Sequence, residues 1–533
     1  MALVINTNLS SIKAQINLER TQSSLSTSLQ RISSGLRINS PRDDAAGLAI
    51  SQRLTSQIGN IGRAIKNAND GIGLVQSAEG ALQEVSEGLQ KIQGLATAAN
   101  NGSISPTDRN LLQGDVIKAI EGINHVTENA AFNGLDVLTG KIVNAEFQVG
   151  IRAEQAIRVS IPLTAASHIG NYFIKTDNTN VSAIGAAKLG IALGIAPTNF
   201  VQRQTVTIRG FSSGQAGSQI GVEEGETAKS IAAKINAVEA QTGVTAIASS
   251  NVTLEDIYNG AASGEQKISF NLYGINAKVT SKAVFISAKI TSNKEDGLSG
   301  LVKAINDQSF TTGIKARFFS ETTDEGEVGK ILLENGGTDI SIEKFNNDPV
   351  GDITVAVDAT TLTVSGFNGT QKVTLTEASD PNSLGDSVTV GGIVTLNSAK
   401  TFTATSDADA DGSLFLSGVL GVPQTADFSA LFDANLSTVE GAKSALLVAT
   451  SALDFISSLR GELGGIQNRF VSTITNLGAV QENTQTARSQ ILDADFAQET
   501  ASLTRAQVLQ QAGIAILAQA NTTPQAVLAL LRT

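Results

Sequence analysis

The serine that most suggests catalysis lies in residues 210–214, Gly-Phe-Ser-Ser-Gly, which match the Gly-x-Ser-x-Gly pattern of hydrolase nucleophiles. In hydrolases with this pattern, an acid and then a histidine follow the serine along the chain. Both histidines of this chain, His125 and His168, precede it. A metalloprotease would need His-Glu-x-x-His in the same region, which has no histidine. We interpret the pattern as a glycine-rich turn and expect no catalytic residues and no enzymatic activity.

Three aspartates at alternate positions, Asp407, Asp409 and Asp411, resemble the opening of a calcium-binding loop. Such a loop needs a glutamate at its twelfth position, which is Gly418 here. These aspartates are the candidate metal ligands of the sequence, and an acidic turn is the favoured alternative. With 2 histidines and no cysteine, the chain lacks the residues for a histidine-rich or thiolate site, so we expect no cofactor.

Composition excludes further classes of protein. The 533 residues carry a net charge of −12, which argues against nucleic acid as a partner. The start of the chain lacks the cationic and apolar regions of a Sec signal peptide. The most apolar stretch, residues 508–520, contains three glutamines and is too short to span a membrane, so we expect no membrane partner.

Capping boxes predict where three long helices begin. In each box a serine accepts a hydrogen bond from a free amide of the first turn, and a carboxylate lies three residues later. A proline follows two of the serines, at the helical position where a missing N–H costs nothing. The predicted caps are Ser40, Pro41 and Asp43, then Ser105 and Asp108, and finally Ser437 and Glu440.

Apolar residues at both ends of the chain alternate in steps of three and four, which is the pattern of helices that bury one side against a partner helix. The last segment, residues 503–531, is apolar, with glutamines between, and is interrupted by Pro524. We expect a terminal coiled coil through Leu25, Leu29, Ile32, Leu36, Leu503, Leu509, Ile516, Leu517, Val527 and Leu531. We expect a second helical seam through Leu54, Ile58, Ile61, Ile65, Leu82, Leu89, Leu453, Ile456, Leu463 and Phe470.

The middle of the chain, from about residue 170 to 430, consists of short alternating runs separated by Gly, Thr, Ser, Asn and Asp, which predict β-strands and turns. One motif occurs twice in it: Ile-Asn, five residues, then Thr-Gly, at 235–243 and at 305–313. Each copy predicts a short helix that leads through a turn into a strand. The expected fold is multi-domain α+β, with long helices from both ends and a β-rich central insert.

These motifs together resemble the bacterial flagellin family, the subunits of flagellar filaments. The stretches that carry the resemblance are 28–51, 66–82, 132–138 and 147–150 near the amino terminus, and 461–470, 482–501, 508–521 and 524–532 near the carboxyl terminus. The twofold motif is similar to one found in the outer parts of some flagellins and hook-associated proteins.

The resemblance implies three domains and a function. Residues 1–40 and 494–533 would form an inner coiled coil, residues 41–170 and 435–493 a helical domain with a β-hairpin, and residues 171–434 the β-rich outer part. The implied function is self-assembly into the extracellular helical filament that serves motility, after secretion by the flagellar type III export apparatus. The implied partners are other copies of the chain, an export chaperone at the carboxyl-terminal end, and the filament cap and hook-junction proteins.

Flagellins detected by a Toll-like innate receptor present an arginine, a leucine and a glutamate on their first helices. The matching positions here are Lys91, Leu95 and Asp115, with Gln90 beside them. Lysine lacks the planar fork of arginine, and aspartate is shorter than glutamate, which predicts weaker recognition.

Two alternatives remain open at this stage. A hook–filament junction protein has similar ends, although the complete terminal motifs and large insert favour a filament subunit. A central insert that also binds glycans or surfaces would leave no fixed sign in the sequence.

Overall fold

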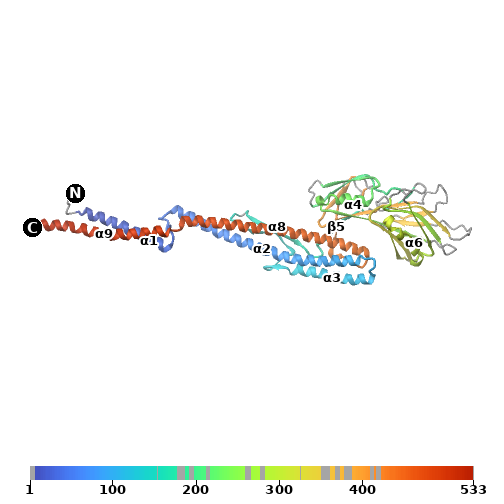
Figure 1. The fold of residues 1–533 in the computed structure, drawn as a ribbon, viewed down its shortest axis with the longest axis horizontal. Helices are drawn as coiled ribbons and strands as arrows, with labels where there is room; N and C mark the ends of the chain where they lie inside the picture. Colours follow the sequence, from blue (N-terminus) through green and yellow to red (C-terminus); the bar gives the residue numbers. More distant parts are fainter. Residues whose placement is uncertain are drawn as a thin grey trace. The chain divides into compact units, whose positions relative to one another are not determined.

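The computed structural model describes residues 7–152, 154–176, 186–190, 197–211, 217–257, 266–276, 283–323, 326–349, 361–366, 372–376, 387–408, 413–415 and 422–531. Five long helices come from the two ends of the chain: α1 (Leu9–Ser34), α2 (Ala45–Ala99), α3 (Pro106–Asn129), α8 (Val439–Leu492) and α9 (Phe496–Leu531). β-Strands dominate the described residues between α3 and α8 (Figure 1). The chain is therefore an α+β protein, as its sequence predicts.

Contacts divide the chain into two compact units. The first contains residues 1–81, 130–162 and 460–533, and the second contains residues 82–129 and 163–459. Two of the boundaries between these units fall within α2 and α8. The division into three domains that the sequence predicts stays a prediction.

Phe470 of α8 lies at the centre of the first unit. Its side chain is fully buried, and its ring meets Phe147 edge-on with the ring centroids 5.7 Å apart. Phe147 lies on a hairpin of β3 (Thr139–Gln148) and β4 (Ala156–Leu163), which Asn67 of α2 holds by donating to the Gln148 carbonyl at 3.0 Å. Beside the hairpin lie the short strands β1 (Ala131–Phe132) and β2 (Leu135–Asp136), which pair with each other.

The second unit buries the apolar positions where α2, α3 and α8 enter it. Leu82, Leu89 and Ile456 are fully buried, and Gln93 of α2 donates to the Thr450 hydroxyl of α8 at 3.1 Å. Gln113 of α3 donates to the Ala434 carbonyl and accepts from the Leu436 amide, which anchors the segment that precedes α8. That segment includes a short 3₁₀ helix, η2 (Leu431–Asp433).

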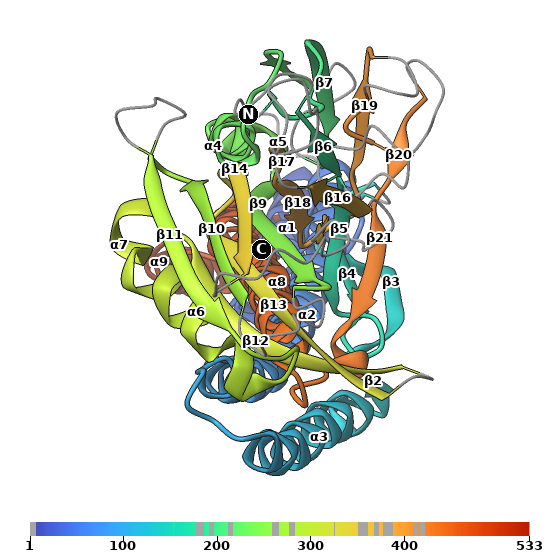
Figure 2. The ribbon, with the colours of Figure 1, turned by 90° about the vertical axis from the view of Figure 1, so that its right-hand side faces the viewer.

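The described strands of the second unit form three sheets. An eight-stranded sheet has the order β12-β13-β9-β18-β5-β21, with β15 and β16 attached at β9; a five-stranded sheet has the order β11-β10-β14-β17-β6; and a four-stranded sheet has the order β20-β19-β7-β8. Figure 2 shows β10, β11 and β14 side by side, with α6 next to β11. The bounds are β5 (Gly170–Lys175), β6 (Ala187–Leu189), β7 (Gln204–Arg209), β8 (Ser218–Val222), α4 (Ala228–Asn236), α5 (Glu239–Thr242), β9 (Thr245–Glu255), β10 (Gln266–Tyr273), β11 (Val284–Ile290), α6 (Glu295–Asp307), α7 (Ser309–Thr312), β12 (Lys315–Thr323), β13 (Gly326–Asn335), β14 (Ile340–Pro349), β15 (Thr361–Ser365), β16 (Lys372–Thr376), β17 (Val388–Val390), β18 (Ile393–Ser398), β19 (Thr403–Ser406), β20 (Gln424–Thr425) and β21 (Asp427–Ala430).

Two features of the helices differ from the sequence prediction. Helix α9 continues through Pro524, which the sequence predicts as an interruption. Within the described part of the chain, α8 has an 18-residue window apolar enough to cross a membrane by length and composition, of which 39% is buried in the protein. Core helices of water-soluble proteins pass the same test, so this window alone does not indicate a membrane span.

Glycine 71 lets α2 approach Phe470. A Cβ atom at this position would lie 2.5 Å from the Phe470 ring, whereas a Cβ at Gly62 of the same helix would meet nothing within 4 Å. We expect Gly71→Ala to lower the free energy of unfolding by about 1–3 kcal/mol, because the buried ring must shift. As the matched control, Gly62→Ala should raise it by up to about 1 kcal/mol through helix propensity. Denaturant unfolding followed by circular dichroism measures both, and equal effects would contradict this packing.

Candidate assembly surface

The first and last helices pair with each other in antiparallel directions. Gln510 of α9 donates to the Gln22 side chain of α1, and Asn8, which precedes α1, donates to the Ala520 carbonyl at 2.8 Å. The two helices lie side by side in Figure 1. Leu25 and Ala506 are buried in this pairing, at 8% and 5% exposure. The structure therefore brings the two ends of the chain together, as the terminal coiled coil requires.

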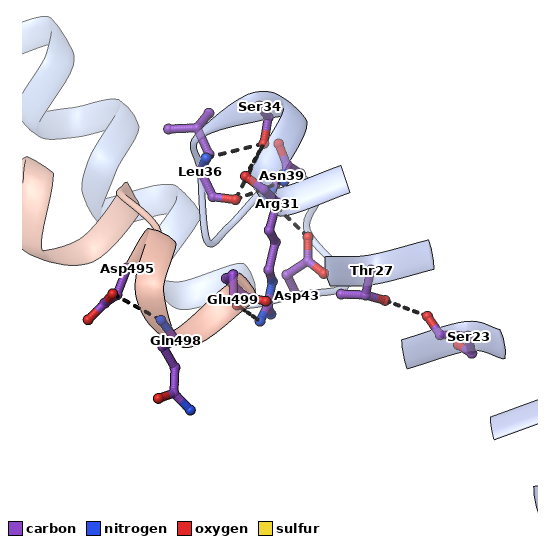
Figure 3. A network of polar contacts seen from close by, with 10 residues as sticks. All are labelled: Ser23, Thr27, Arg31, Ser34, Leu36, Asn39, Asp43, Asp495, Gln498 and Glu499. Atoms are coloured by element: carbon purple, nitrogen blue, oxygen red, sulfur yellow. Dashed lines mark hydrogen bonds and ion pairs between the residues drawn. The ribbon is translucent and has the colours of Figure 1, made fainter. Parts of the chain in front are cut away.

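An ion pair joins the two helices near the ends that face the rest of the unit. Arg31 Nη1 lies 2.9 Å from Glu499 Oε1, and the two side chains are 29% and 12% exposed (Figure 3). The Nε atom of Arg31 is buried and has no hydrogen-bond partner among the described residues. Because the Glu499 carboxylate is largely removed from water, it depends on Arg31 for its charge partner.

The connections that leave α1 and enter α9 hydrogen-bond to each other. Gly35, with φ +71°, ends α1 in the left-handed conformation, and its carbonyl accepts from the Ala494 amide at 3.0 Å. Leu36 forms a β-bridge with Asp493, and the Arg37 amide donates to the Leu492 carbonyl at 2.6 Å. These bonds hold the end of α1 and the start of α9 together, so the helix pair begins from a fixed register.

Asp43 organises the turn that follows α1. Its Oδ2 accepts from the Asn39 amide at 3.0 Å (Figure 3). It also accepts from the Ser40 amide at 2.8 Å. These backbone hydrogen bonds, first that of Ser40 and then that of Asn39, hold the pKa of the Asp43 carboxyl below its usual value. The sequence prediction that Ser40, Pro41 and Asp43 cap this helix is therefore wrong. These residues close a turn, and α2 begins only at Ala45.

The caps of α2 and α8 are formed by other residues than those predicted, whereas the cap of α3 is the predicted one. The Asp44 carboxylate accepts from the Gly47 amide at 2.8 Å and so caps α2 in place of Ser40. At α8 the cap is Thr438, which accepts from the Gly441 amide at 3.0 Å, because the Ser437 side chain and amide both donate to Asn435. Glu440, the predicted partner in that box, lies 3.6 Å from Arg317 and 3.3 Å from Lys443. At α3 the predicted box is present, with Ser105 accepting from the Asp108 amide and donating to its carboxylate.

The residues predicted for the terminal coiled coil fall into two groups. Leu25 is buried, and Ile32, Leu36, Leu503 and Leu517 are half-buried, although Leu36 lies beyond the end of α1, in the bridge. Leu29, Leu509 and Ile516 are exposed, at 49%, 53% and 60%. The side chains of Val527 and Leu531 lie outside the described part. Among the described side chains of α1 and α9, the large apolar ones that are exposed are Leu9, Ile12, Ile16, Leu29, Phe496, Val508, Leu509, Ile514 and Ile516.

We call these nine side chains the terminal apolar rows. Single exposed apolar residues are common on folded proteins, but several on one pair of helices indicate a surface that another molecule covers. By contrast, the second predicted seam is filled within the chain. Ile61, Leu82, Leu89, Ile456, Leu463 and Phe470 are buried, and Leu54, Ile58, Ile65 and Leu453 are half-buried.

The positions predicted for receptor contact lie on α2 and α3 of the second unit. Gln90, Lys91 and Asp115 are exposed, and Leu95 is half-buried. Asp115 also pairs with Lys118 of its own helix at 3.4 Å. These side chains are accessible in the single chain.

Of the residues predicted for chemical sites, the structure describes only a part. Asp407 accepts from the Thr205 amide and so ties β19 to β7, while Asp409, Asp411 and Ser212 lie outside the described residues. No group of three or more possible metal ligands occurs in the described part of the chain. His125 and His168 are both exposed.

Sequence reasoning missed the ion pair of Arg31 with Glu499 and the bridge at Leu36. Their partners lie more than 450 residues away, and no local pattern marks such a pair. One signal could have found the ion pair: an arginine near the end of the first predicted helix and a glutamate near the start of the last one.

Three family models match the chain. They describe the bacterial flagellin N-terminal helical region (residues 5–142), the bacterial flagellin C-terminal helical region (446–531) and the flagellin hook IN motif (205–255). The B-type flagellin of Pseudomonas aeruginosa is 35% identical over 537 residues, and flagellin A of Helicobacter pylori is 31% identical over 543 residues. Each alignment covers 100% of both chains. Among solved structures, FliC from Burkholderia pseudomallei is 16% identical over 75% of this chain and 99% of its own, with a TM-score of 0.27.

Removing the charge of Arg31 should loosen the helix pair. We expect Arg31→Met to leave the Glu499 carboxylate without its partner and to cost about 1–3 kcal/mol of local stability. Hydrogen exchange of the α1 and α9 amides in the assembled polymer would then become faster. Arg20→Met, at an exposed position of the same helix, is the control. Equal exchange in the two variants would show that the ion pair adds nothing to the pairing.

Proposed function

Because this chain belongs to the bacterial flagellin family and is a structural subunit of the flagellar filament, we propose that its terminal helices complete their folding only when they dock on other copies. The terminal apolar rows carry this proposal. They are the part of the helical seams that the single chain does not bury. A helix pair with so much exposed apolar surface is marginal in water and gains stability from each partner it meets.

Docking of this kind makes growth directional. Free subunits would hold α1 and α9 in a loose pairing, and the tip of a filament would offer the apolar surface that completes it. Folding and binding then occur together, and the cost of ordering is met at the moment of assembly. Contacts between different surfaces of neighbouring copies give an open helical polymer when they do not close into a ring.

The same surface supports proposals about partners and location. Exposed apolar helices need protection before assembly, and an export chaperone that covers the carboxyl-terminal helix would supply it. We propose that the chain travels through the flagellar type III export apparatus to an extracellular filament. There it would meet the filament cap and the hook-junction proteins through its terminal helices. A subunit of this kind needs no catalytic residues, and we propose that the chain is not an enzyme.

One residue of the terminal apolar rows tests the assembly mechanism. We expect Ile516→Ser to raise the concentration of subunit left unassembled after seeding by about tenfold or more, since a buried isoleucine contributes roughly 2 kcal/mol. The thermal unfolding of the free subunit should not change, because Ile516 is 60% exposed there. Ile247→Ser, at a residue of β9 that is 44% exposed, is the matched control. Assembly of the Ile516 variant at the wild-type concentration would refute the proposed role of the rows.

We also propose that the exposed face around Lys91 and Asp115 is recognised, weakly, by the Toll-like innate receptor. Arginine binds a carboxylate through two parallel hydrogen bonds, which lysine does not offer. The double variant Lys91→Arg with Asp115→Glu should therefore raise receptor signalling by about tenfold, the effect of roughly 1.4 kcal/mol. Lys66→Arg, elsewhere on α2, should leave signalling unchanged. A receptor-expressing reporter cell line measures both, and equal signalling from the two variants would count against this site.

A further inference from the structure

The β-rich region contains the same structural module twice. Strands β7 and β8, helices α4 and α5, and strand β9 follow one another in the first module. Strands β10 and β11, helices α6 and α7, and strand β12 follow in the same order in the second. In both, the first two strands pair as an antiparallel hairpin. The hook IN motif model matches residues 205–255, which is the first module alone.

Equivalent asparagines fix equivalent strands in the two modules. The Asn236 side chain accepts from the Ala246 amide at 2.6 Å and donates to its carbonyl at 2.9 Å. The Asn306 side chain does the same with Ala316, at 2.7 and 2.8 Å. The twofold motif of the sequence therefore encodes one repeated hydrogen-bond arrangement, which aligns the residues of β9 with those of β12.

The residue that follows each of these alanines differs between the modules. In β9 it is Ile247, which is uncharged and 44% exposed. In β12 it is Arg317, whose side chain is 43% exposed. Because the first module makes the same asparagine bonds beside an isoleucine, the fold of the module does not require an arginine at this position. The ion pairs of Arg317 lie instead outside its module, on β13 and α8.

Four side chains of alternating charge form a closed ring between β12, β13 and α8. Arg317 Nε of β12 lies 3.6 Å from Glu334 Oε2 of β13, and Arg317 Nη2 lies 3.6 Å from Glu440 Oε1 of α8. Lys443 Nζ of α8 lies 3.3 Å from Glu334 Oε1 and 3.3 Å from Glu440 Oε1. Each charge thus has two neighbours of opposite sign. We call these four residues the charged ring.

Water and salt reach the charged ring. The side chains of Arg317, Lys443 and Glu440 are 43%, 44% and 54% exposed, and that of Glu334 is 26% exposed. An isolated ion pair with this exposure is weak, whereas several charges that share partners in a network hold one another in place. The attraction within such a network falls as dissolved ions screen its charges.

A buried polar contact joins the same sheet to α8 at another place. Ser451 of α8 donates to Asn171 Oδ1 of β5 at 3.0 Å, and the Asn171 side chain donates to Asn397 Oδ1 of β18 at 2.7 Å. All three residues are buried. Strands β5 and β18 belong to the eight-stranded sheet that also contains β12 and β13. This sheet is therefore attached to α8 by a buried contact without charge and by a charged contact that salt can reach.

We propose that the charged ring is a salt-sensitive contact that sets the angle between the eight-stranded sheet and α8. The screening length of the solution falls from about 10 Å at 0.1 M salt to about 3 Å at 1 M, which is close to the separation of the charges in the ring. The buried contact at Asn171 carries no charge, so it persists at high salt. When the ring opens, the sheet pivots about Asn171. The orientation of this sheet on its helix thus depends on ionic strength.

The absence of cysteine from the sequence permits two spin labels on introduced thiols. Thr311→Cys on α7 and Ser457→Cys on α8 place them at exposed positions outside the charged ring. Pulsed electron resonance measures the distribution of distances between the labels. The full chain is kept below the concentration at which it assembles, and the measurement is made at about 0.1 M and about 1 M sodium chloride.

We expect the distance distribution to widen by roughly twofold or more at the higher salt concentration, because screening opens the ring. Lys443→Gln removes both ion pairs that Lys443 makes, so it should give the wide distribution at both salt concentrations. The matched control is Lys303→Gln. Lys303 pairs with Asp307 of its own helix at 2.7 Å, so this variant removes an exposed ion pair that does not involve α8, and it should behave as the wild type.

Arg317→Ile places the residue of the first module in the second and should match Lys443→Gln, while the thermal unfolding of the subunit stays unchanged. A wild-type distribution that is the same at both salt concentrations would overturn the proposal. A narrow distribution in either ring variant at the lower salt concentration would do so as well. Either result would leave the role of the terminal apolar rows intact, because the charged ring contains none of their residues.

Discussion

The pairing of α1 with α9 is the constraint on which the rest of the chain depends. Arg31 and Glu499 are 468 residues apart in sequence but form an ion pair. The chain between them must therefore fold as a loop whose two ends meet at this helix pair. The entropy of closing a loop grows only slowly with its length, by about 0.6 kcal/mol for each doubling. A large central region between two fixed helical ends therefore costs little more than a small one, which explains how the β-rich modules can lie between them.

The helical seams divide according to whether one chain can fill them. Phe470 packs against Gly71 and Phe147, and Leu82 and Leu89 are fully buried, so α2 and α8 complete their cores within the chain. On α1 and α9, Leu25 is buried while Leu29, one turn later, is 49% exposed. The same sequence pattern thus produces a finished core in one place and an unfinished surface in the other. The exposed part is the surface that we propose for assembly, and the buried part gives the single chain its core.

The sequence predicts local features of this fold better than distant ones. The box at Ser105 is present as predicted, whereas Asp43 bonds to the turn before α2 and Asn435 accepts from Ser437. The apolar periodicity of the sequence is the same around Leu25 and around Ile516. It does not predict which of these two side chains is buried within the single chain and which stays exposed. The order of strands is also hidden, because β9 pairs with β13 and β18, which follow it by many residues. Both assignments depend on contacts between segments far apart in sequence, which local propensity does not encode.

The repeated module shows the same division between local and distant control. Asn236 and Asn306 make identical bonds, and Gly243 and Gly313 turn the chain in the same way, because these interactions span only about ten residues. The strands that end the modules, β9 and β12, enter one sheet on either side of β13, while the two hairpins join different sheets. Local sequence therefore builds the turn of each module, and long-range strand pairing decides which sheet each hairpin joins.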